Sequence, residues 1–105
     1  MKMEISENEK KRIDLFEKFL KHLDSCLRDI LETINAPGAE SGLTQSKGTA
    51  ITTIDSLIML SRDTDQRRIL TLLRVAIKDG DKNEVKSAIS NFSRDYDAYF
   101  KNKKI

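Results

Sequence analysis

The sequence predicts an all-α protein, a small antiparallel bundle of three to four helices with a long N-terminal helix that follows a heptad pattern. Two observations predict this class. The only proline and all four glycines lie between Pro37 and Gly48 or at Gly80, which leaves two long stretches without a helix breaker. On these stretches apolar residues recur at steps of three and four, as on the buried face of an amphipathic helix. The 105 residues suit a single helical domain over 1–105.

The first helix is predicted over residues 7–35. Ser6 and Glu9 have the spacing of a capping box, in which each side chain satisfies a backbone amide of the other residue at a helix start. Pro37 disfavours the α conformation in the residue before it, so the helix should end near residue 35. Such a helix is about 42 Å long, which exceeds the diameter of a compact sphere of this size and predicts an elongated or oligomeric domain. Its apolar heptad consists of Ile13, Phe16, Leu20, Leu23, Leu27, Ile30 and Ile34.

The middle of the chain is predicted to hold a flexible loop and two helices. Residues 36–48 contain three of the glycines among small polar side chains and are therefore expected to form the loop. Helices are expected over 50–61 and 65–79, because a polar segment interrupts the apolar face between them; a single helix over 50–79 is the alternative. The second of these helices would bury Ile69, Leu70, Leu72, Leu73, Ala76 and Ile77.

The last helix is predicted over residues 82–100. Asp81 and Glu84 repeat the capping-box spacing at its start, with aspartate as the cap. Residues 101–105 are expected to fray as a tail. The inner face of this helix would carry Val85, Ala88, Ile89, Phe92, Tyr96, Tyr99 and Phe100.

Composition and charge limit the function classes. Hydrophobic residues make up 38% and charged residues 34% of the chain, which is enough apolar material for a core inside a highly charged exterior. The net charge of +2 is far from the strongly positive balance of a dedicated nucleic-acid coat. The single cysteine, Cys26, excludes an internal disulfide framework and suits a reducing compartment. Because we find neither a secretory signal nor about 20 consecutive apolar residues, we expect a cytoplasmic protein without a membrane partner.

No complete catalytic, metal or cofactor motif is present in the sequence. Residues 42–49 resemble a phosphate-binding loop, but Lys47 precedes Gly48 instead of following it, and no strand comes before the segment. His22 and Cys26 could supply two ligands from one helical turn, whereas a structural zinc site needs four. No nucleophile, base and orienting group occur together. We therefore expect no enzymatic activity, no metal and no cofactor.

The apolar stripe of the first helix is the leading candidate for a functional surface. If this helix is longer than its own bundle can cover, an apolar end remains for a partner helix; the competing interpretation is that the whole stripe is intramolecular core. The first interpretation predicts a non-catalytic protein-interaction module, either a small adaptor or inhibitor, or a bundle that self-associates like a coiled coil. Its partner would be another protein or itself, in a homo-oligomer or a hetero-complex. The candidate residues are Phe16, Phe19, Leu20, Leu23, Leu27 and Ile30.

The alternative function is that of a nucleic-acid-binding regulator that uses a basic helix. A tight turn over residues 61–65 would create a helix-turn-helix whose reading helix begins Gln66, Arg67, Arg68. Asp63 and Asp65 oppose this alternative, because they would face phosphate. The candidate nucleic-acid contacts are Arg67, Arg68, Arg74, Lys78, Lys101, Lys103 and Lys104.

Overall fold

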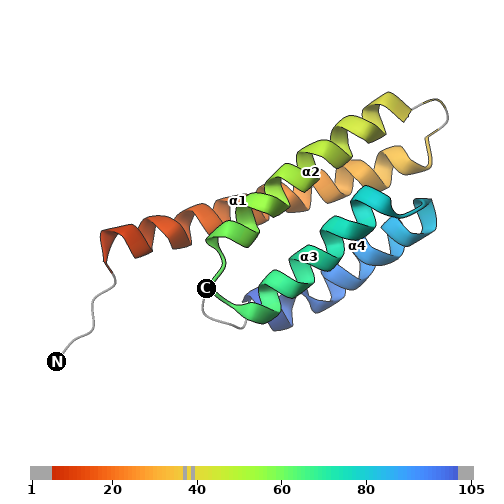
Figure 1. Ribbon diagram of the computed structural model, residues 1–105. Helices are drawn as coiled ribbons and strands as arrows, with labels where there is room; N and C mark the ends of the chain where they lie inside the picture. Colours follow the sequence, from red (N-terminus) through yellow and green to blue (C-terminus); the bar gives the residue numbers. More distant parts are fainter. Residues whose placement is uncertain (1–5, 37, 39, 102–105) are drawn as a thin grey trace.

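The computed structural model describes residues 6–36, 38 and 40–101, and all regular elements within these ranges are helical. Helices that follow one another along the chain run antiparallel and lie side by side (Figure 1). The predicted all-α class and the antiparallel bundle are therefore confirmed. The elements are α1 (Glu7–Ile34), α2 (Glu40–Leu60), α3 (Thr64–Asp79), α4 (Lys82–Tyr96) and a short π-helix, η1 (Asp97–Lys101).

The bundle is elongated, with extents of 60 × 21 × 18 Å and a radius of gyration of 15.0 Å. A compact domain of this size would have a radius of gyration of about 13 Å. The elongation follows from α1, whose 28 residues form one uninterrupted helix. None of the helices, over the residues that the structure describes, combines the length and the apolar character needed to cross a membrane.

Side-chain caps fix the starts of three helices. The hydroxyl of Ser6 accepts a hydrogen bond from the backbone amide of Glu9 at the start of α1. Asp81 and Glu84 form both halves of the predicted capping box at α4, with N···O distances of 2.8 and 3.1 Å. At α3 the carboxylate of Asp63 accepts from the backbone amide of Gln66 at 3.0 Å. Each cap satisfies an amide that the helix itself leaves without a partner.

The prediction of a flexible loop over residues 36–48 is wrong from residue 40 onward, because α2 begins at Glu40. Packing against α1 outweighs the low helix propensity of this segment. Leu43 packs against the core, and a Cβ at Gly42 would lie only 3.7 Å from the side chain of Thr33. The reversal before α2 includes Gly38, whose φ of 72° suits glycine.

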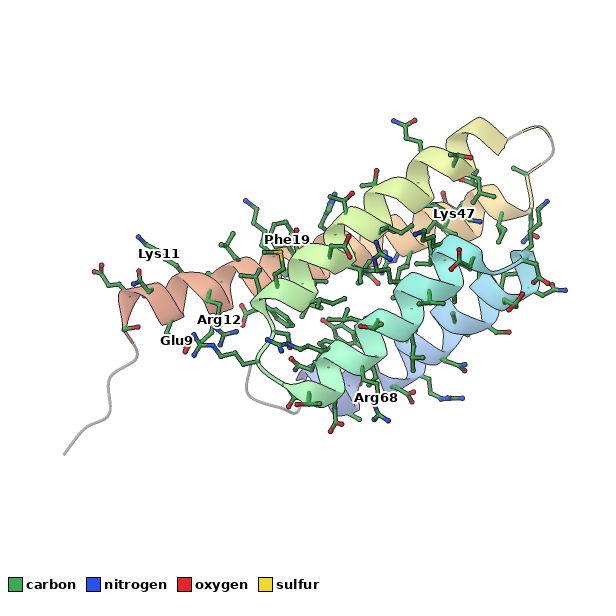
Figure 2. All side chains as sticks on the ribbon, in the orientation of Figure 1. Glu9, Lys11, Arg12, Phe19, Lys47 and Arg68 are labelled. Atoms are coloured by element: carbon green, nitrogen blue, oxygen red, sulfur yellow. The ribbon has the colours of Figure 1, made fainter. Side chains whose placement is uncertain are left out.

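Residues 50–79 form two helices, and three residues separate α2 from α3. Two arginine side chains stabilise this reversal by donating to carbonyls near the end of α2. Arg12 Nη1 donates to the carbonyl of Leu60, and Arg67 Nε donates to the carbonyl of Ser61, both at 2.7 Å. Arg12 also bonds Glu9 (Figure 2), and this hydrogen bond lowers the pKa of the Glu9 carboxyl from its ordinary value. The first turns of α1 are thereby joined to the α2–α3 connection.

The last helix is shorter than predicted, because the α-helical part of the expected segment 82–100 ends at Tyr96. The π-helix η1 then continues to Lys101, a residue that was expected to belong to the frayed tail. The rest of that tail, residues 102–105, lies outside the described part of the chain. The wider turn of η1 places Phe100 in the core. Its ring lies 6.2 Å from that of Phe16 and 5.5 Å from that of Tyr96, measured between centroids.

Candidate functional site

The six candidate residues of the α1 stripe lie in the core or pack against it, so the expectation that they form a free apolar surface for a partner is wrong. Five of these six residues are buried, and Phe19 is half-buried against the same core. The physical reason is packing by several elements: α2 lies along α1, and Phe100 of η1 stacks on Phe16 with ring centroids 6.2 Å apart. The five buried candidates are Phe16, Leu20, Leu23, Leu27 and Ile30.

Two of the candidate nucleic-acid contacts are already engaged within the bundle. Arg74 makes two hydrogen bonds to the carboxylate of Asp55, at 2.6 and 3.4 Å, and so ties α3 to α2. Arg67 binds the carbonyl at the end of α2, as described above. Each guanidinium is held in a fixed geometry by an acceptor of the chain itself.

The other candidate contacts are exposed or lie outside the described part. Arg68 and Lys78 are exposed, and Figure 2 shows Arg68 at the edge of the bundle away from α1 and α2. The structure does not describe the side chain of Lys101, nor residues Lys103 and Lys104. Among the basic residues of α3, Arg67 and Arg74 thus contact the α2 side of the bundle. Arg67 is nevertheless exposed, as are Arg68 and Lys78.

The structure does not form the helix-turn-helix that the sequence suggested. In that motif the second helix crosses the first and presents its N-terminal residues to DNA. Here α2 and α3 lie side by side along the bundle (Figure 1). Gln66, the first residue of the expected reading helix, is only 1% exposed and accepts a hydrogen bond from the hydroxyl of Ser61 at 3.0 Å. The start of α3 therefore belongs to the core.

The chemistry-bearing residues do not form a reactive cluster. His22 is exposed, whereas Cys26 is buried; burial raises the pKa of the Cys26 thiol above its ordinary value of 9.0, and a hydrogen bond with Thr53 acts in the opposite direction. Both residues line a hollow of about 310 Å³ between α1 and α2. Throughout the described ranges, no group of three or more His, Cys, Asp or Glu residues is arranged to hold a metal ion. Residues 42–49 are helical, which removes their resemblance to a phosphate-binding loop.

Two neighbouring apolar side chains on α3 are exposed to solvent. Leu72 is 65% exposed and Val75 is 49% exposed. They lie one helical turn apart on the face of α3 opposite the residues that enter the core. The other exposed large apolar residues of the described chain are Leu15 and Leu31, far apart on α1, and Met59 on α2. Leu72 and Val75 are therefore the pair that combines exposure with adjacency on one helix.

We call Arg68, Leu72, Val75 and Asp79 the outer stripe of α3. Its members follow one another at spacings of four, three and four residues, and all four are exposed. The buried residues of α3 have the same spacing, two positions earlier in the sequence: Gln66, Leu70, Leu73 and Ile77. Since one helical turn takes 3.6 residues, this shift places the two sets on opposite faces. α3 thus presents one stripe to the core and another to solvent.

A groove of about 260 Å³ runs between α3 and α4 beside the outer stripe. Leu72 belongs to both features and joins them into one surface. The groove combines apolar side chains with a polar edge that α4 supplies. It is lined by Ile69, Leu72, Leu73, Ala88, Asn91, Phe92, Arg94 and Asp95.

This surface was not predicted from the sequence, because Leu72 was assigned to the core face of the helix and Val75 to neither face. Seven apolar residues between 69 and 77 occupy more than one face of a helix, and this excess was the available signal. No protein-family model, no curated protein and no solved structure matches the chain. A function is accordingly inferred from the described surface alone.

Proposed function

We propose that the chain is a non-catalytic protein-interaction module, either a small adaptor or inhibitor or a self-associating bundle, and that it acts through the outer stripe of α3 and the adjoining groove. The observation that carries this proposal is the exposure of Leu72 and Val75 beside the α3–α4 groove. Surfaces that bind another protein typically expose neighbouring apolar side chains to water. Such side chains often lie beside a groove, and polar groups surround them.

A partner helix fits the dimensions and chemistry of this surface. An amphipathic helix that lies along α3 can cover Leu72 and Val75 with apolar residues spaced three or four apart. Burying one such side chain contributes roughly 1.5 to 3 kcal/mol. Arg94 and Asp95 lie at the α4 edge of the groove and offer both signs of charge to the partner.

Affinity capture with two matched variants tests the proposal. The tagged chain would be expressed in its native cell, and half of each sample would be treated with nuclease before the bound proteins are identified. We expect the wild-type chain to retain a stoichiometric protein after nuclease treatment and Leu72→Asp to lose it, because the substitution places a charge in the apolar contact.

The control is Met59→Asp, which introduces the same charge at an apolar residue of α2 that is 84% exposed. This variant should retain the partner as well as the wild-type chain does. Equal capture by all three proteins contradicts the proposal. Loss of all captured material on nuclease treatment, with nucleic acid in the untreated half, would instead support a nucleic-acid-binding regulator that uses the exposed Arg68 and Lys78.

A further inference from the structure

The outer stripe of α3 is complementary to an antiparallel copy of itself. Its spacings of four, three and four residues are the same in both directions along the helix. A two-fold axis that passes between Leu72 and Val75 places each leucine opposite the valine of the other copy. The same axis places Arg68 opposite the partner's Asp79, and symmetry repeats this contact. An apolar centre is thus flanked by two pairs of opposite charge.

The two charges of the outer stripe are poorly compensated within one chain. Arg68 is 63% exposed on its side chain and contacts Asp65 at 3.5 Å, a long and solvent-accessible ion pair. Asp79 is exposed and is the last residue of α3. The helix dipole favours positive charge in the last turn of a helix, so Asp79 carries the disfavoured sign there. An antiparallel copy brings a carboxylate to Arg68 and a guanidinium to Asp79.

We infer that the outer stripe binds a second copy of this chain, in an antiparallel two-fold dimer whose α3 helices pack against each other. The inference rests on the proposed function, because it names the partner of the same surface. The stripe carries one positive and one negative charge, so it attracts its own copy without favouring a strongly acidic or strongly basic partner. One helix face is smaller than a standard interface of about 1,600 Å². The dimer is therefore weak, with a dissociation constant between about 1 µM and a few hundred µM.

Sedimentation velocity of the full chain, from about 1 µM to about 1 mM, tests the dimer. The sedimentation coefficient of the wild-type chain should rise with concentration from the monomer value to the dimer value. Leu72→Asp should remain monomeric throughout, because it places two carboxylates in the apolar centre. Its circular dichroism spectrum should match that of the wild-type chain, since residue 72 does not contribute to the core.

A charge exchange tests the antiparallel register. Arg68→Asp and Asp79→Arg should each weaken the dimer roughly tenfold, since each substitution converts two attractive pairs into two repulsive pairs. The double variant Arg68→Asp/Asp79→Arg should regain the wild-type dissociation constant to within about threefold. Both positions are exposed, so the circular dichroism spectrum and thermal unfolding of each variant should match those of the wild-type chain, which separates a weaker dimer from loss of folding.

The outcomes separate this inference from the proposed function. A wild-type chain that stays monomeric up to about 1 mM overturns the dimer, and so does a dimer that Leu72→Asp leaves unchanged. A double charge variant that is no tighter than the single variants overturns the register. If the wild-type chain is monomeric but captures another protein that Leu72→Asp loses, the proposed function stands and the dimer fails. If neither self-association nor capture responds to Leu72→Asp, both fail.

Discussion

At the scale of single residues, Cys26 shows how the bundle alters the chemistry of a side chain. Its thiol is buried between α1 and α2, and burial raises its pKa because the thiolate is poorly solvated there. The unfolded chain therefore loses this proton at a lower pH than the folded chain. The stability that results is fully present below the ordinary pKa of 9.0 and is lost as the pH rises through the raised pKa of the folded state.

We expect the free energy of unfolding to fall as the pH rises from about 9.0, the ordinary pKa of the thiol, through the raised pKa of the folded state, and to fall less steeply in Cys26→Ala. The measurement is urea unfolding of both proteins at several pH values. Tyr96, whose pKa burial also raises, is present in both proteins and cancels from the comparison. Equal slopes for the wild-type chain and Cys26→Ala would show that the Cys26 thiol is not desolvated.

At the scale of the elements, α2 shows where local sequence and tertiary packing disagree. Glycine, serine and threonine in its first half are typical of a loop, yet the segment is helical from Glu40. Its threonines bond back to carbonyls one turn earlier, as Thr49 does to Gln45 and Thr52 does to Gly48. Propensity along the chain predicts the wrong state here because it contains no information on the neighbouring face of α1.

The start of α4 shows the opposite case, in which a local pattern was sufficient. The spacing of Asp81 and Glu84 predicted a capping box, and both of its hydrogen bonds are present. Gly80 completes the turn, because a Cβ there would lie 2.5 Å from the carbonyl oxygen of Ala76. The same spacing at Ser6 and Glu9 predicted a second capping box, of which only the Ser6 half is present. The Glu9 carboxylate pairs with Arg12 and Arg62 instead.

We expect Asp81→Ala to lower the free energy of unfolding by roughly 0.5 to 2 kcal/mol, because the substitution removes the N-cap of α4. Asp81→Asn is the matched control, since asparagine caps a helix about as well as aspartate does. Chemical denaturation of the three proteins measures the difference. An alanine variant as stable as the asparagine variant would mean that the capping box makes no net contribution.

At the scale of the whole molecule, the helical class was predictable, but the assignment of faces was only partly so. The heptad of α1 predicted an apolar stripe correctly. Which element covers that stripe depends on how far α2 extends along α1, and the heptad does not contain this information. On α3 the apolar residues were too numerous for one face, and only the packed bundle separates the buried Leu70 and Leu73 from the exposed Leu72. Face assignment requires the positions of all helices, and these depend on contacts between distant segments.

The bundle also explains why α3 offers a free face. α3 packs against α2 on one side and α4 on the other, and its buried stripe points to the common core. The opposite side, with Leu72 and Val75, has no neighbouring element among the described residues to cover it. Association through this face therefore requires no rearrangement of the core.

The apolar stripe of α1, which includes Leu20, belongs to the core, whereas the outer stripe of α3, which includes Leu72, is free surface. Thermal and chemical unfolding of Leu20→Asp and Leu72→Asp, side by side, tests this assignment most directly. We predict that Leu20→Asp loses at least about 3 kcal/mol or does not fold, because it buries a carboxylate without a partner. Leu72→Asp should stay within about 1 kcal/mol of the wild-type chain. A Leu20→Asp that stays within about 1 kcal/mol of the wild-type chain, or a Leu72→Asp as unstable as Leu20→Asp, would contradict the assignment of the two faces.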